Sequence, residues 1–126
     1  MIPLCASEAL VDGGPGIRFE LLFRGERAPA FAVRHAGTVV AYLNRCAHVA
    51  MELDWQPGYF FEPDGEFLIC ATHGALYDPA TGACQGGACA GHGSLRPIAL
   101  VERGQRVCWV PDAQAQPLRD AANRID

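Results

Sequence analysis

The sequence of 126 residues contains no lysine, so each permanently positive side chain is one of its 10 arginines. The formal net charge is -4, and no run of like charge reaches the length that is typical of a nucleic-acid-binding or membrane-binding tail. We therefore expect neither nucleic acid nor membrane as a partner.

Long apolar stretches are also missing. No window approaches the roughly 18 apolar residues of a membrane-spanning helix, and residues 1–8 lack the basic start and apolar run of a signal peptide. These absences predict a cytoplasmic protein. In a reducing cytosol, the six cysteines are better explained as metal ligands or free thiols than as a disulfide framework.

Helical periodicity is almost absent, whereas short apolar or alternating runs separated by turn residues are frequent. Their spacing of roughly 8–12 residues is typical of an all-β sandwich or barrel. A hairpin is expected across Ala36-Gly37, and Pro97 favours a sheet edge or a strand start. The predicted strands span residues 18–23, 31–35, 38–43, 66–70, 95–102 and 106–110.

The length and the apolar content of 50% fit one folded unit with one core. We predict a single domain over residues 1–111. The polar, alanine-rich tail over residues 112–126 is expected to be a short helix or frayed.

Two short motifs carry the chemistry: Cys46-Ala47-His48 and Cys70-Ala71-Thr72-His73. Each follows a predicted strand and places one thiolate and one imidazole on a tight loop. Two such loops at neighbouring hairpin tips would clamp a metal centre from two sides.

This ligand set fits tetrahedral zinc or a [2Fe-2S] cluster in which the two thiolates bind one iron and the two imidazoles bind the other. Zinc sites of two cysteines and two histidines usually pair like ligands along the chain. Here each loop supplies one of each kind, which favours the cluster and leaves a zinc-stabilised binding module as an alternative.

The two motifs, followed by Gly74, Tyr77-Asp78, Gly82 and a glycine-rich stretch, resemble the Rieske [2Fe-2S] domain over roughly residues 3–111. The resemblance implies a compact antiparallel β-sandwich or barrel with a small cluster-binding subdomain at one tip. It also implies a redox partner that docks near the outermost ligands, the two histidines. The implied ligands are Cys46, His48, Cys70 and His73.

The chain departs from the family pattern in three places. The spacer between His48 and Cys70 has 21 residues, longer than in compact members, and the usual prolines of the covering loop are replaced around Cys89. Met51 and Thr72 stand where respiratory members carry extra cysteines. The chain is therefore more similar to the soluble ferredoxins of oxygenase systems.

The resemblance also indicates how the cluster is tuned. Tyr77 stands where a tyrosine hydroxyl can donate to a cysteine sulfur, whereas Ala75 replaces a serine donor of high-potential members. We expect a potential in the lower to middle part of the Rieske range of about -150 to +300 mV.

Several other residues have an unremarkable explanation. Cys84 and Cys89 are close enough in sequence for a disulfide, but two free thiols are favoured in a reducing compartment. His35 and His92 are expected to be exposed. The spacer aromatics are a docking patch or, as is more usual, a small core under a long loop; they are Trp55, Tyr59, Phe60 and Phe61.

The leading functional hypothesis is one-electron transfer from a reductase to a terminal oxygenase or related enzyme, with transient docking near His48 and His73. Independent catalysis is not expected, because only His35 and His92 remain to build a second iron site. An alternative is a cluster-bearing small or regulatory subunit of a larger reductase, similar to the small subunit of assimilatory nitrite reductase.

Overall fold

The computed structural model describes residues 1–46, 51–71, 74–87 and 93–118 of the chain. Its largest element is a five-stranded antiparallel sheet with the order β11-β2-β3-β4-β8. These strands are β2 (Ile17–Phe23), β3 (Glu26–His35), β4 (Thr38–Leu43), β8 (Pro97–Ile98) and β11 (Ala115–Gln116).

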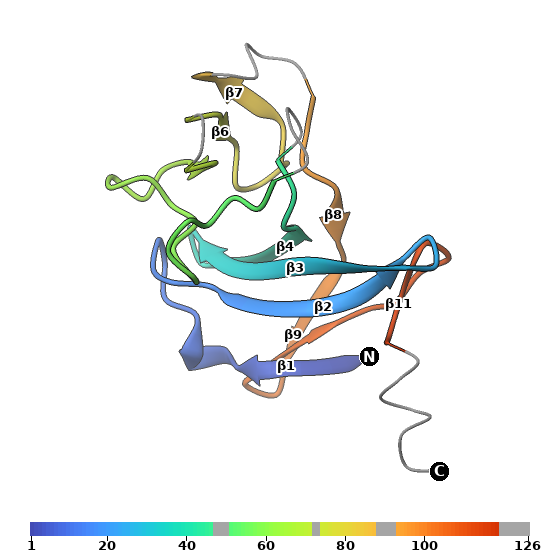
Figure 1. The fold of residues 1–126 in the computed structure, drawn as a ribbon. Coiled ribbons are helices and arrows are strands. Elements are labelled where there is room, and N and C mark those ends of the chain that lie inside the picture. The colour runs from blue at the N-terminus through green and yellow to red at the C-terminus, as the bar shows by residue number, and fades with distance from the viewer. Residues whose placement is uncertain (47–50, 72–73, 88–92, 119–126) are drawn as a thin grey trace.

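Two three-stranded antiparallel sheets have the orders β1-β10-β9 and β5-β6-β7. Figure 1 shows β5–β7 on one side of the five-stranded sheet and β1 with β9 on the other. The remaining elements are β1 (Ile2–Ala6), a short 3-10 helix (Ser7–Ala9), β5 (Leu68–Ile69), β6 (Leu76–Tyr77), β7 (Cys84–Gly86), β9 (Leu100–Arg103) and β10 (Arg106–Trp109). The prediction of an all-β fold is confirmed.

Strand β3 is buried on both faces because it is the middle layer of this arrangement. Side chains alternate between the faces of a strand, so Phe31 and Val33 enter the core beneath β5–β7. Ala30 and Ala32 enter the second core, which β1 and β10 cover. Large residues thus support the small sheet, and small residues allow the other sheet to pack closely.

The hairpin between β3 and β4 turns at Ala36 and Gly37, with φ angles of 51° and 83°. Two successive positive φ angles are the requirement of a tight two-residue hairpin turn. The pairing of His35 with Thr38 fixes the register, so the predicted hairpin is confirmed. Strand β3 begins at Glu26, five residues before the predicted start.

Two predictions fail at the C-terminal end. The single strand expected over residues 95–102 is divided between sheets, because β8 pairs with β4 while β9 pairs with β10. Pro97 in β8 lies on the edge of its sheet, as predicted. The tail is neither helical nor frayed at Ala115–Gln116, where β11 pairs with β2. Residues 119–126 lie outside the described part.

No helical segment in the described part of the chain is long and apolar enough to cross a membrane.

Candidate metal centre

Cys46 lies just beyond the end of β4, where the chain leaves the central sheet. Its amide donates to the carbonyl of Met51 at 2.7 Å, and the preceding amide of Arg45 donates to Leu43 at 2.9 Å. The Cys46 side chain is buried. The loop that Cys46 opens is therefore closed at Met51 by a backbone hydrogen bond.

Cys70 directly follows β5. Its amide donates to the carbonyl of Ala75 at 2.9 Å, and its carbonyl accepts from the amide of Gly74 at 2.7 Å. Gly74 has a φ of 76°, a left-handed conformation that glycine adopts without steric cost. These bonds hold Cys70 and Ala75 together at the neck of a tight loop, which explains the glycine after the second motif.

The backbone of Leu53 connects the two cysteine-bearing segments. Its amide donates to Oδ1 of Asn44 at 2.8 Å, two residues before Cys46. Its carbonyl accepts from the amide of Ala71 at 2.9 Å, one residue after Cys70. One residue of the long spacer thus fixes the separation of the two loops.

Asp54 holds this part of the spacer in place. Its carboxylate is completely buried and accepts hydrogen bonds from Nδ2 of Asn44 at 2.8 Å and from the amide of Gly58 at 3.0 Å. The Arg18 guanidinium lies 3.2 Å away and also pairs with the exposed Glu52 at 2.6 Å. The buried charge is well partnered, which offsets its desolvation cost.

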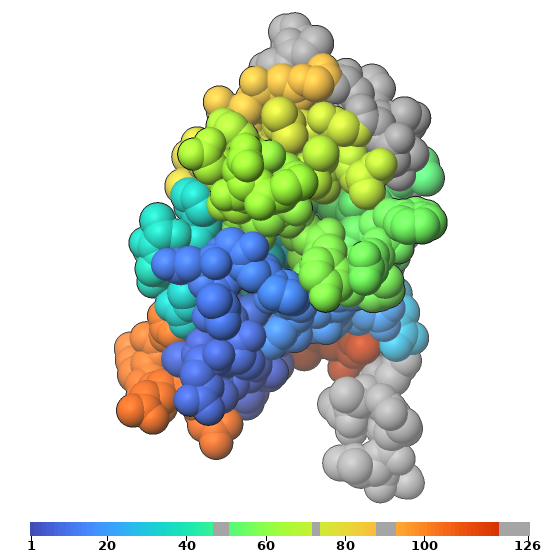
Figure 2. Space-filling model, turned by 90° about the vertical axis from the view of Figure 1, so that its left-hand side faces the viewer, coloured from blue at the N-terminus to red at the C-terminus, as the bar shows by residue number. Residues whose placement is uncertain are grey.

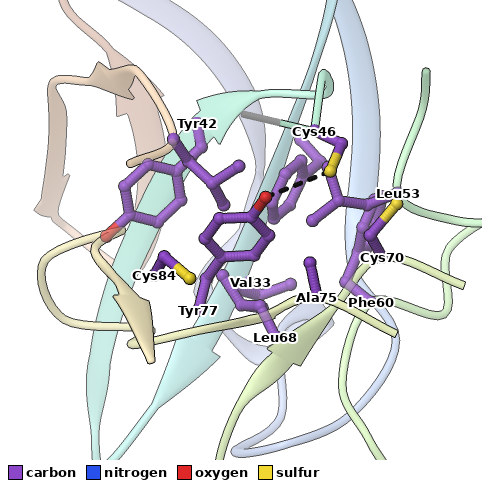
Figure 3. Packing of buried hydrophobic residues seen from close by; sticks show 12 residues of the cluster. Val33, Tyr42, Cys46, Leu53, Phe60, Leu68, Cys70, Ala75, Tyr77 and Cys84 are labelled. Carbon is purple, nitrogen blue, oxygen red and sulfur yellow. Dashed lines mark hydrogen bonds between the residues drawn. The ribbon is translucent and has the colours of Figure 1, made fainter. Parts of the chain in front are cut away.

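Cys46, Cys70 and Tyr77 belong to one cluster of buried residues beneath the small sheet. Figure 3 shows both cysteines along one edge of this cluster, with the Tyr77 hydroxyl directed at Cys46. The distance from Tyr77 Oη to Cys46 Sγ is 3.0 Å. When the sulfur binds a metal it carries no proton, so the hydroxyl is then the donor.

Tyr42 supports the turn that follows Tyr77. Its hydroxyl donates to the carbonyl of Pro79 at 2.7 Å, and burial, with a smaller contribution from the charge of Asp78, raises the pKa of Tyr42 to about 12. Gly82 packs against the Tyr42 ring so closely that a Cβ would lie 2.7 Å from Cε1. The glycine of this turn is therefore required by a close approach as well as by its φ of 80°.

A family model of the Rieske [2Fe-2S] domain matches residues 2–102 of this chain. The chain belongs to the Rieske [2Fe-2S] domain family. Its cofactor is therefore a [2Fe-2S] cluster.

Solved Rieske proteins share this fold at low sequence identity. The ferredoxin of carbazole 1,9a-dioxygenase from Nocardioides aromaticivorans IC177 is 22% identical, with a TM-score of 0.64 over 88% of this chain and 97% of that chain. The Sphingomonas yanoikuyae B1 ferredoxin is 21% identical, with a TM-score of 0.66 over 88% of this chain and 98% of that chain.

A third similar structure comes from a complex of reduced oxygenase and oxidized ferredoxin in carbazole 1,9a-dioxygenase. It is 19% identical, with a TM-score of 0.64 over 86% of this chain and 100% of that chain. Such identities show the Rieske fold alone. No protein of curated function matches the chain significantly.

The described residues fit the Rieske cluster. Cys46 and Cys70 are reduced cysteines outside any disulfide, and thiolate sulfur is the ligand that iron–sulfur clusters require. The predicted ligands His48 and His73 lie outside the described residues. Among the residues that are described, no group of three or more histidine, cysteine or acidic side chains gathers around a point. The four-ligand set therefore stays a prediction.

The other cysteines differ in state. Cys84 is disulfide-bonded, so the expectation of a free thiol there is wrong; Cys89 lies outside the described residues. Cys5 and Cys108 are half-buried free thiols, and burial is the main cause that raises the pKa of Cys5.

The spacer aromatics are divided between the core and the surface. Phe60 is buried and stacks on Phe31 with ring centroids 4.0 Å apart, as a small core requires. Trp55 and Tyr59 are exposed. His35, expected at the surface, is half-buried beside Phe61, while His92 lies outside the described residues.

Sequence reasoning missed Asn44 and Asp54, which hold the spacer between the two cysteine loops. A signal was present, since an asparagine at the end of a predicted strand and an aspartate among apolar residues both need hydrogen-bond partners when buried.

Ala75, expected to be a position without a donor, is buried beside Cys70.

Proposed function

We propose that the protein is a one-electron carrier whose Rieske cluster is held by Cys46 and Cys70 on one iron and by His48 and His73 on the other. The observation that carries this proposal is that two buried cysteines from separate loops belong to one apolar cluster, with the Tyr77 hydroxyl beside one sulfur. When bound, the cluster supplies a site that takes up and releases a single electron.

The chain contributes the surroundings of the cluster. Burial of both sulfurs keeps water from the cysteine side, and once Cys46 Sγ binds iron the Tyr77 hydroxyl donates one hydrogen bond to it. The hydrogen bonds through Leu53 link the two loops, and we expect this link to limit reorganisation on electron transfer. These features suit a carrier, since the cofactor performs the redox chemistry itself.

We further propose that the protein accepts its electron from a reductase and delivers it to a terminal oxygenase or related enzyme. The support is that similar structures are ferredoxins, one of them solved from a complex with its oxygenase. The contacts are expected to be transient, because redox encounters usually bury less than about 1,200 Å².

The test is visible absorption and low-temperature EPR of the anaerobically purified, reduced protein, with its iron, sulfide and zinc contents. We expect a Rieske spectrum and one electron taken up per chain. A colourless protein with stoichiometric zinc would replace the proposal with a zinc-stabilised module.

The ligands are tested by replacement. His48→Ala and His73→Ala are each expected to abolish the Rieske EPR signal, because an imidazole ligand to one iron is lost. His35→Ala is the matched control, since His35 lies in β3 and should leave the signal intact. Retention of the signal in a His48 or His73 variant would remove that residue from the ligand set.

A further inference from the structure

The long spacer presents its largest apolar side chains to solvent. Trp55 is 86% exposed, Tyr59 54% and Met51 47%. Across the described residues only two other large hydrophobic side chains, Met1 and Val11, are comparably exposed. Large apolar side chains that gather on one exposed segment usually mark an interaction site.

Their exposure is imposed by the anchors of the loop. Leu53 and Asp54 before Trp55, and Phe60 after Tyr59, are buried. The amide of Tyr59 donates to the carbonyl of Gln56 at 3.0 Å, and the amide of Gly16 donates to the carbonyl of Gly58 at 2.7 Å. The turn that carries Trp55 and Tyr59 is therefore held on both sides with these two side chains exposed.

The backbone of the loop that carries these side chains is hydrogen-bonded to both cysteine-bearing segments. The carbonyl of Met51 accepts from the amide of Cys46, and that of Leu53 accepts from the amide of Ala71. The same loop thus carries the patch and closes onto both cysteine-bearing segments. In Figure 2 the green residues of this loop adjoin the yellow-green residues that follow them on the same face.

Charge is divided unevenly along the chain. Residues 46–95 contain six acidic residues and no arginine or lysine, whereas the remaining residues contain all 10 arginines and eight acidic residues. Two of these six acidic residues, Glu52 and Asp54, pair with Arg18 from outside this stretch. Glu62, Asp64 and Glu66 lie on the turn that follows the exposed loop, and Asp64 and Glu66 are exposed. The stretch of chain that bears both cysteines is therefore net negative.

We infer that Met51, Trp55 and Tyr59 form the docking surface for the protein that exchanges electrons with the cluster, and that this partner offers an apolar pocket within a basic rim. The inference rests on the proposed function. Tryptophan, tyrosine and methionine are enriched in interface cores, and opposite charge around them accelerates the encounter. A second copy or an anionic membrane would bring like charges together at this surface.

The test uses cytochrome c, a basic haem protein, as the electron acceptor from the reduced, cluster-loaded protein in anaerobic stopped flow. The second-order rate constant should fall by about tenfold or more as the ionic strength rises from about 20 mM to about 500 mM. At low salt, Trp55→Ala should lower it about fivefold, because a central tryptophan often dominates a protein interface. Trp55→Phe should recover part of the loss.

Two controls separate docking from the redox chemistry. Ferricyanide is small and needs no docking surface, so its reduction rate should be the same for Trp55→Ala and the unmodified protein. The double variant Glu62→Gln/Glu66→Gln should reduce the salt dependence of the rate with cytochrome c. Glu26→Gln should leave that dependence unchanged, since Glu26 begins β3 away from β5–β7 (Figure 1).

An unchanged rate with cytochrome c in Trp55→Ala, or a rate that rises with salt, would overturn the docking surface while leaving the carrier function intact. A protein that reduces neither acceptor would instead overturn the proposed function.

Discussion

The phenolic oxygen of Tyr77 lies 3.0 Å from the sulfur of Cys46, and both side chains are buried. A hydrogen bond to a cluster sulfur stabilises the reduced form, which carries the extra negative charge, more than the oxidised form. Tyr77→Phe removes the donor and keeps the ring. The reduction potential should therefore fall by about 40 mV for a differential hydrogen-bond energy of about 1 kcal/mol, as measured by protein-film voltammetry.

Tyr42→Phe is the matched control for this effect. Tyr42 is buried in the same cluster, but its hydroxyl donates to Pro79 rather than to a sulfur. This variant should lose stability by about 1 kcal/mol and keep its potential. Equal potentials for Tyr77→Phe and the unmodified protein would show that the Tyr77 contact does not tune the cluster.

Asp54→Asn should destabilise the spacer. The carboxylate accepts from Asn44, from Gly58 and from the Arg18 guanidinium, and an amide of the same size cannot accept from all three donors. We expect a loss of about 2–3 kcal/mol in the free energy of unfolding, measured by denaturant titration, and earlier loss of the Rieske absorption on heating.

Glu52→Gln removes the exposed carboxylate that pairs with the same arginine, Arg18. The Arg18–Glu52 pair is exposed, so its loss should cost less than about 1 kcal/mol. Similar losses of unfolding free energy in Asp54→Asn and Glu52→Gln would mean that the burial of Asp54 does not strengthen its interactions.

Local sequence patterns were sufficient for the parts of the fold in which neighbours in sequence are neighbours in space. The β3–β4 hairpin was predicted because Ala36-Gly37 provides the turn and alternation marks both strands. The two cysteine loops were predicted because each motif is a few residues long.

Pairings between distant segments were not predicted. The separation of β8 from β9 and the pairing of β11 with β2 depend on which edge strand is available, and no local pattern encodes that. The roles of Asn44 and Asp54 were missed for the same reason, since a polar residue shows its importance only when its distant partners are buried with it.

The Arg34–Glu102 pair predicts a change of stability at acid pH. The Arg34 guanidinium donates to Glu102 at 2.5 Å, and it also donates to the carbonyls of Leu10 and Ser7. The hydrogen bond from Arg34 is the main cause that lowers the pKa of Glu102 from its ordinary value of about 4.5.

A carboxyl whose pKa is lowered by folding stabilises the native state above the ordinary value and loses this effect as the pH falls through the lowered value. The unmodified protein should therefore exceed Glu102→Gln in stability at pH 7 by about 1 kcal/mol or less, because the pair is partly exposed. The difference should vanish well below pH 4.5 in denaturant titrations. A difference independent of pH would exclude the ion pair as its cause.

Gly82→Ala should be strongly destabilising because two costs combine at this position. Gly82 has a φ of 80°, and an added Cβ would lie 2.7 Å from Cε1 of Tyr42 and 3.1 Å from the carbonyl oxygen of Leu95. Tyr42 cannot move away readily, since it is buried and its hydroxyl is bonded to Pro79. We expect a loss of about 3 kcal/mol, measured by denaturant unfolding of the cluster-loaded protein.

Gly104→Ala separates the conformational cost from the clash. Gly104 has a φ of 59° in the β9–β10 turn, and nothing lies within 4 Å of its added Cβ. Only the left-handed conformation is then penalised, by about 1 kcal/mol. Equal losses at the two glycines would show that the Tyr42 ring gives way, and the close approach would then not be what requires a glycine in the turn after Tyr77.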